Sequence, residues 1–150
     1  MKKSIKVLIA FVLIVLLSGC GAKKGLSKKE INNKLFGLGF DIYDVTDKIE
    51  DKSVKTVLSA NYKGKYQIEY YAFDNEDSAE KAFKSNKNEL IKSNGDKGKT
   101  KSGSNYDRYI QQLSDKYIVV TRVDNTLVYV FSNIDYKKDI KKVLKKINYY

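Results

Sequence analysis

Residues 71–77, YAFDNED, mark the point at which a strand pattern changes into a helix pattern. Side chains alternate between two faces over residues 66–73, which predicts a β-strand. The residues DNED that follow supply N-cap side chains and carboxylates suited to the positive end of a helix. The same order recurs in residues 129–135, YVFSNID, where Tyr, Phe, Asn and Asp coincide. Two strand-to-helix junctions therefore organise the predicted fold.

Further strands are predicted on both sides of these junctions. Lys63-Gly64 separates two strands as a tight hairpin, because glycine readily takes the positive φ that such turns need. A three-strand meander, with turns at Ser114-Asp115 and Asp124-Asn125, leads to the second junction. The predicted strands are residues 40–46, 54–62, 66–73, 106–113, 117–123 and 126–131. Residues 93–105 contain no apolar side chain and are predicted to form a long loop.

Three helices are predicted, of which the first begins at a capping box formed by Ser27 and Glu30. The second follows the acidic residues after the first junction, and Asn133 precedes the third. Their apolar stripes comprise Ile31, Leu35 and Leu38, then Ala79, Ala82, Phe83, Leu90 and Ile91, then Ile140, Val143, Leu144 and Ile147. Lysines cover the rest of the third helix, which suits either a membrane-surface helix or a core helix with a basic outer face. We favour the core helix.

These elements predict an α+β domain over residues 26–150, with a single antiparallel sheet of about five to six strands and three helices packed on it. The two similar junctions add the hypothesis of a pseudo-twofold βββα repeat. Chance, or convergent chemistry at the end of a strand, explains so short a similarity equally well.

The first 20 residues have the layout of an export signal. A positive run over residues 1–6 precedes an apolar run over residues 7–17, which is too short to span a bilayer as a helix. The run ends in Leu17-Ser18-Gly19-Cys20, which resembles the lipobox of bacterial lipoproteins. The resemblance implies diacylglyceryl attachment to the Cys20 sulfur and cleavage before Cys20, but it indicates no family for the rest of the chain.

The resemblance divides the chain into a signal peptide at residues 1–19, a lipidated tether at residues 20–25 and the domain. It places the domain on the extracytoplasmic face of the cell membrane, held by lipid on Cys20. The alternative is a free thiol, since a single cysteine excludes an intrachain disulfide. We expect residues 21–25 to pack against nothing.

The composition offers few of the side chains that commonly act in catalysis. The chain has no histidine, the usual general base near neutral pH, and Cys20 is its only thiol. We therefore predict no enzyme, no cofactor and no metal site, although a small hydrolase built on a Ser-Lys pair or paired carboxylates stays open. Five carboxylates within residues 41–51 invite a calcium hypothesis, but their spacing does not match an EF-hand loop. Ordinary turn residues are the favoured interpretation.

The formal net charge is +11, yet only Arg108 and Arg122 among the 29 basic residues are arginine. Lysine, asparagine, isoleucine and tyrosine have AT-rich codons, so part of the basicity can be compositional. An export signal also argues against nucleic acid as a partner. Tyrosine accounts for 12 of the 150 residues. Tyrosine and arginine dominate protein-binding surfaces, which makes Arg108, Arg122 and Tyr129 candidate binding residues, although tyrosine is also simply a good strand former.

The two arginines lie on neighbouring predicted strands. Depending on the register of the Ser114 turn, they face each other or lie diagonally, and in the second case Asp107 is the expected partner of Arg122. The sequence therefore predicts a non-catalytic binding or accessory module for an envelope protein. The alternative is binding of an anionic envelope polymer through the lysine-rich surface.

Overall fold

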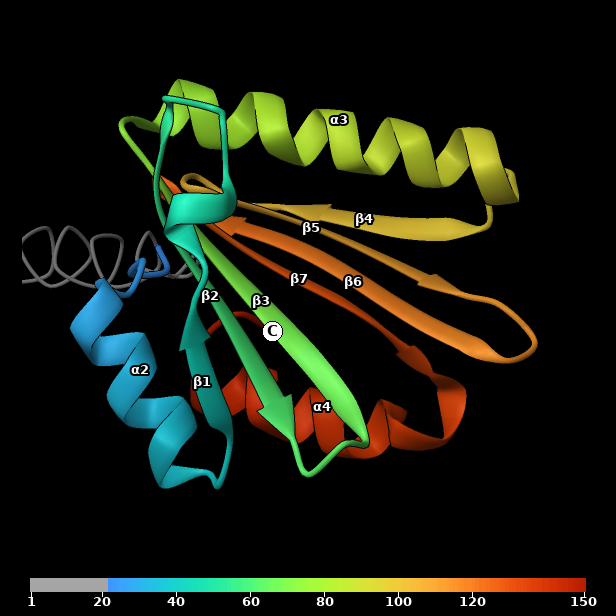
Figure 1. Ribbon diagram of the computed structural model, residues 1–150. Coiled ribbons are helices and arrows are strands. Elements are labelled where there is room, and N and C mark those ends of the chain that lie inside the picture. Colours follow the sequence, from blue (N-terminus) through green and yellow to red (C-terminus); the bar gives the residue numbers. More distant parts are fainter. Residues whose placement is uncertain (1–21) are drawn as a thin grey trace, which may run out of the picture.

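The computed structural model describes residues 22–150, which form one seven-stranded antiparallel open sheet with three helices packed on it. The strands run in the order β1-β2-β3-β7-β6-β5-β4 across the sheet (Figure 1). They are β1 Asp41–Asp44, β2 Val54–Tyr62, β3 Tyr66–Phe73, β4 Gly98–Ser102, β5 Tyr106–Gln112, β6 Lys116–Val123 and β7 Thr126–Asn133. The helices are α2 Lys28–Gly37, α3 Glu76–Asn94 and α4 Lys137–Lys146, with short 3₁₀ turns η1 Thr46–Lys48 and η2 Ile134–Tyr136. The predicted α+β class is confirmed.

The seventh strand corrects the prediction of a long loop over residues 93–105. Helix α3 continues to Asn94, and β4 then pairs with β5 at the edge of the sheet. Four of its five residues are exposed, so its polar side chains carry no alternation of apolar and polar positions. Its pairing rests on backbone hydrogen bonds to β5, which any sequence can make.

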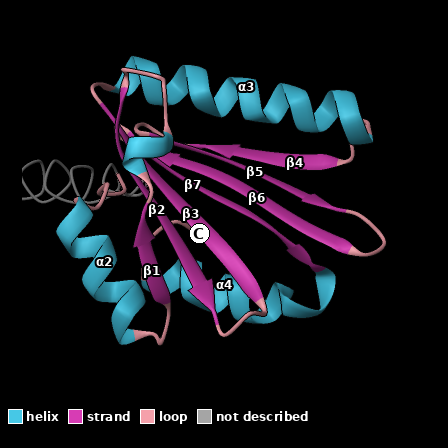
Figure 2. Cartoon of the chain, in the orientation of Figure 1, coloured by secondary structure: helices cyan, strands magenta, loops and turns pink. Residues whose placement is uncertain are grey.

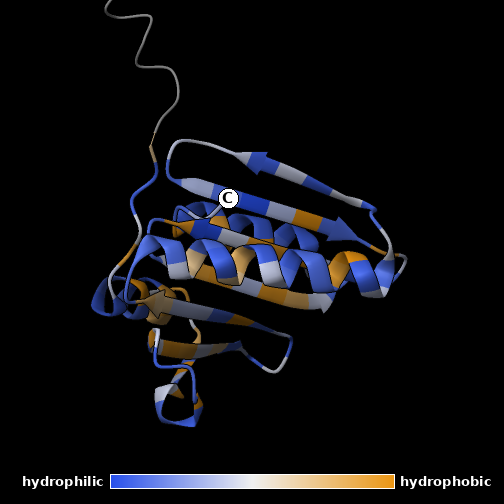
Figure 3. Cartoon of the chain, turned by 90° about the horizontal axis from the view of Figure 1, so that it is seen from above, coloured by the Kyte–Doolittle hydropathy of each residue, from blue (hydrophilic) through white to orange (hydrophobic). Residues whose placement is uncertain are grey.

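Helices cover both faces of the sheet (Figures 1 and 2). Tyr117 and Val119 of β6 belong to the core shared with α2 and α4, whereas Ile118 and Val120 belong to the core shared with α3. Strand β6 is therefore buried on both sides, because neighbouring residues of a strand point to opposite faces. Figure 3 shows α3 as largely hydrophilic with separate hydrophobic positions, as expected for a helix with one buried side.

The hypothetical βββα repeat agrees with the arrangement of the strands, but not with the placement of the helices. Strands β3 and β7 end the two three-strand units and lie side by side at the centre of the sheet. A twofold axis perpendicular to the sheet would relate two antiparallel neighbours and would leave both following helices on one face. Instead α3 and α4 lie on opposite faces (Figure 1). The chain enters α3 two residues after β3, whereas η2 intervenes between β7 and α4.

Local turn and cap chemistry follows the sequence. The Ser27–Glu30 capping box is present, and Lys63 and Gly64 have φ values of 51° and 72° in the β2–β3 hairpin. Such a pair of positive φ values matches the right-handed twist of the flanking strands. The tether differs from expectation, because Lys23 and Gly25 make hydrogen bonds to the domain. Cys20 lies outside the described residues.

Candidate functional site

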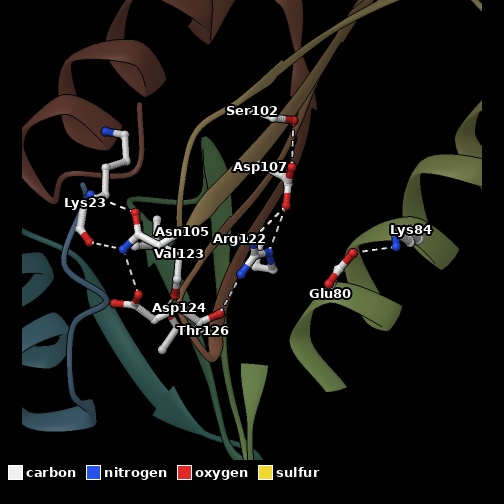
Figure 4. Close-up of polar contacts among 10 residues, drawn as sticks. All are labelled: Lys23, Glu80, Lys84, Ser102, Asn105, Asp107, Arg122, Val123, Asp124 and Thr126. Atoms are coloured by element: carbon white, nitrogen blue, oxygen red, sulfur yellow. Dashed lines mark hydrogen bonds and ion pairs between the residues drawn. The ribbon is translucent and has the colours of Figure 1, made fainter. Parts of the chain in front are cut away.

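Arg122 lies inside a polar network on the α3 face of the sheet (Figure 4). It is directly opposite Asp107 in the β5–β6 register, and its Nε and Nη2 donate to Asp107 Oδ2 at 2.9 and 2.8 Å. Its Nη1 donates to the Asp124 carbonyl at 3.2 Å, and Ser102 Oγ donates to Asp107 Oδ1 at 2.7 Å. Asp107 is thus the partner of Arg122, as the diagonal register predicts. With only 8% of its surface exposed, Arg122 has few donors to offer a partner.

The three candidate binding residues do not share one surface. Arg108 points to the face that carries α2 and α4, where its guanidinium lies 4.3 Å from the centre of the Tyr150 ring. Tyr129 is half-buried on the α3 face, as is Arg122. The sheet therefore separates Arg108 from the other two residues.

Tyr129 lines a groove of about 300 Å³ on the α3 side. In this groove the Tyr71 hydroxyl donates to Glu69 Oε2 at 2.6 Å. Burial raises the pKa of both Tyr71 and Tyr129, and the Glu69 carboxylate raises them further. The groove is lined by Ile49, Asp51, Val54, Glu69, Tyr71, Phe73, Ala82, Asn86, Leu127 and Tyr129.

A second cavity, here called the lysine pocket, has a volume of about 270 Å³ and lies beside β4, β5 and α4. It is lined by Lys97, Lys99, Ile110, Gln112, Tyr117, Lys137, Lys141 and Tyr150. Its lining contains four lysine ammonium groups and no aspartate or glutamate side chain. Within residues 22–150, none of these four lysines forms an ion pair shorter than 4.0 Å. Lys137 Nζ instead donates to Gln112 Oε1 at 2.6 Å.

Tyr117 gives the lysine pocket a buried hydroxyl without a partner. The residue is 1% exposed, and its oxygen makes no hydrogen bond within the described part of the chain. The Tyr150 hydroxyl lies close by but does not meet hydrogen-bond geometry, and burial together with this neighbour raises the pKa of Tyr117. An unpaired buried hydroxyl is costly, so an acceptor that entered the pocket would be stabilised there.

Tyr150 shows how the local charges act on an anion. Lys141 and Lys145 lie 5.4 and 5.6 Å from the centre of its ring, and Arg108 stacks on the same ring. Burial of the phenol opposes ionisation, but the positive charges of Lys141 and Arg108 stabilise the phenolate, and the pKa of Tyr150 lies below its ordinary value. The surroundings of this residue therefore favour negative charge.

Sequence reasoning missed the lysine pocket. The sequence pointed to the pocket only through Lys137 and Lys141, which are four residues apart and so lie on one face of the predicted helix. Lys97 and Lys99 fall within the stretch that was predicted to be a loop. Their meeting with α4 depends on the pairing of β4 with β5.

The acidic stretch over residues 41–51 comprises β1, the η1 turn and the loop that follows, and two of its carboxylates bond to nearby residues. Asp44 accepts from Lys28 Nζ and from the backbone and hydroxyl of Thr46, and Asp51 accepts from the backbone and hydroxyl of Ser53. Residues 22–150 contain no cluster of three or more potential metal-ligating side chains.

No protein-family model, curated protein or solved structure matches this chain. In the part of the chain that the structure describes, no helix has the length and apolar character needed to cross a membrane.

Proposed function

We propose that this protein is a non-catalytic, extracytoplasmic lipoprotein, anchored through Cys20, whose lysine pocket binds anionic groups of an envelope polymer. The observation that carries the proposal is the gathering of four lysines in one cavity whose lining contains no aspartate or glutamate side chain. Like charges repel, so this arrangement lowers the stability of the free domain and is relieved when an anion binds.

Two further features support an anionic ligand. The buried Tyr117 hydroxyl can donate a hydrogen bond to it, and the charges that favour the Tyr150 phenolate would favour any anionic oxygen near them. The cavity of about 270 Å³ suits one charged group of a repeating chain rather than a large ligand. Lysine ammonium groups act as point charges that do not demand one orientation of the ligand, which suits a flexible polymer.

The test measures binding of a poly(glycerol phosphate) chain to the mature protein. Lys137→Glu/Lys141→Glu reverses two charges in the pocket. Lys138→Glu/Lys142→Glu makes the same change of net charge on exposed neighbours in the same helix that do not line the cavity. We expect the pocket variant to lose about tenfold or more in affinity, and the control variant to lose much less.

Raised salt should weaken this binding, because screening reduces attraction between exposed charges. Equal losses in the two lysine variants would show that the whole surface, not the pocket, attracts the polymer. Absence of binding by the folded wild-type protein would refute the polymer proposal.

An envelope protein is the second candidate partner, and the groove at Tyr129 supports it. Tyrosine side chains and the 38% exposed Ile49 give this groove the aromatic and apolar character of protein-binding sites. Tyr129→Ala should then abolish capture of one partner from solubilised membranes, and the capture should survive moderate salt. Arg122→Ala is a poor probe here, because it would leave Asp107 without its ion-pair partner.

The anchor has a separate test. Cys20→Ser removes the sulfur that the lipid would modify, so incorporation of labelled fatty acid and normal processing should both be lost. Equal labelling of the wild type and the variant would contradict the proposed anchor.

A further inference from the structure

Residues 23–25 are fixed to one end of the sheet (Figure 4). The Lys23 N–H donates to Asn105 Oδ1 at 3.0 Å, and the Asn105 side-chain amide donates back to the Lys23 carbonyl. The same amide donates to Asp124 Oδ1 at 2.7 Å, while Asp124 Oδ2 accepts from the Gly25 N–H at 2.8 Å. Asn105 and Asp124 thus hold the tether against the β4–β5 and β6–β7 turns.

The docking site has little free space. A Cβ at Gly25 would lie 3.0 Å from the Val123 carbonyl oxygen and 3.1 Å from Thr126 Oγ1. Leu26, the next residue, is buried, and its N–H donates to the Tyr149 hydroxyl at 3.3 Å. The tether therefore enters the domain along one defined path.

Only two residues separate Cys20 from Lys23. Three residues of extended chain span at most about 11 Å, so lipid on Cys20 would hold the docked end close to the bilayer. On the premise that Cys20 is lipidated, as proposed above, we infer that the end of the sheet formed by residues 23–25, 103–105 and 124–125 is the surface that faces the lipid bilayer.

This end carries lysines that can approach lipid headgroups, together with two acidic side chains. Lys24 is an exposed residue of the docked segment, and its Nζ pairs with Glu30 Oε1 at 3.2 Å. Lys101 and Arg108 are paired across β4 and β5, and partial burial together with their charges lowers the pKa of Lys23. The Lys23 ammonium donates to the main-chain oxygens of Asn148 and Tyr150 at 3.2 and 3.0 Å. Among the acids at this end, Asp124 is bonded to Asn105 and Gly25, and Glu30 to Ser27 and Lys24. Lysines near an anionic surface each contribute about 1 kcal/mol of attraction.

Strand β5 provides a matched pair of probes for this orientation. Ser104 lies in the turn before the strand, at the docked end, and Ser114 lies in the turn after it, roughly 25 Å away along the strand. Both residues are exposed. Because Cys20 is the only cysteine and would be acylated, Ser104→Cys and Ser114→Cys each create a single thiol for a fluorophore.

The experiment uses each labelled lipoprotein in vesicles of phosphatidylcholine and phosphatidylglycerol that carry a quencher on the headgroups. We expect the label at position 104 to lose most of its emission and the label at position 114 to lose little. Equal quenching at both positions, or stronger quenching at position 114, would overturn the inferred orientation. Protein that fails to float with the vesicles would instead contradict the anchor.

Asn105→Ala supplies a second test without altering any charge. It removes both hydrogen bonds to the Lys23 backbone, so the domain should tilt more freely and the difference in quenching between the two labels should shrink while flotation persists. An unchanged difference in a folded variant would show that docking of the tether does not orient the domain.

Discussion

Arg122 and Asp107 lie directly opposite each other on β6 and β5, and the carboxylate accepts two hydrogen bonds from one guanidinium. The arginine is 8% exposed, so its charge depends on this partner for compensation. The pair fixes a register in which Arg108 faces away from Arg122. Arg108 and Arg122 therefore lie on opposite faces of the sheet and contact different residues.

Asp107→Ala should destabilise the protein by about 3 kcal/mol or more, because it leaves a buried guanidinium without its counter-charge. Asp107→Leu and Arg122→Leu combined should cost less than the sum of these two leucine substitutions made singly. Urea denaturation of the two single variants and the double variant measures this coupling. The exposed Lys84–Glu80 pair of α3 is the control, and its coupling should stay within about 0.5 kcal/mol. Similar coupling in the two pairs would contradict the buried role of Arg122.

Gly98→Ala should loosen the edge strand. A Cβ at this position would lie 2.1 Å from Cζ of Tyr109, whose ring is 1% exposed and cannot move aside freely. We expect a loss of about 1–3 kcal/mol and faster amide hydrogen exchange in β4. Gly37→Ala is the control, since its Cβ would meet nothing within 4 Å. Unchanged exchange in the Gly98 variant would mean that β4 does not depend on this contact.

Leu144→Ala should test the face of α4 that packs on the sheet. Leu144 is 0% exposed, and truncating a fully buried leucine costs about 2–5 kcal/mol. Lys142→Ala on the same helix is exposed and should change stability by less than about 0.5 kcal/mol. Thermal and urea unfolding measure both variants. Equal destabilisation by the Leu144 and Lys142 substitutions would contradict the packing of the Leu144 face of α4 on the core.

The capping box should make stability depend on pH in acid. Hydrogen bonds from the Ser27 backbone and hydroxyl, followed by that from Lys24, lower the pKa of Glu30 from 4.5 to about 2. A lowered folded-state pKa contributes stability that is complete above about pH 4.5 and is lost as the pH falls towards 2.

Glu30→Gln keeps a side chain that can bond the Ser27 backbone N–H but removes the titration. The wild type should therefore be more stable than the Glu30→Gln variant at pH 6, and this difference in the free energy of unfolding should be smaller at pH 2.5. Urea midpoints at the two pH values give the comparison. A difference that does not change with pH would contradict a charged carboxylate in the cap.

Much of the local structure could be predicted from the sequence. The strand limits at residues 54–62 and 66–73 agree with β2 and β3, because apolar and polar side chains alternate there. The Ser27–Glu30 cap and the Lys63-Gly64 turn depend only on residues close together in the chain. The Arg122–Asp107 pair was also expected, in one of the two registers that the Ser114 turn allows.

Only the tertiary structure decided where these elements go. Strand β4 has polar side chains and owes its place to backbone bonds with β5, which leave no trace in side-chain pattern. The pairing of β3 with β7, the opposite faces taken by α3 and α4, and the docking of Lys23 on Asn105 all join residues far apart in sequence. The lysine pocket is of the same kind, because it brings Lys97 and Lys99 to Lys137 and Lys141. Local sequence patterns reflect interactions between residues close together in the chain, whereas a charged cavity forms only when distant segments pack together.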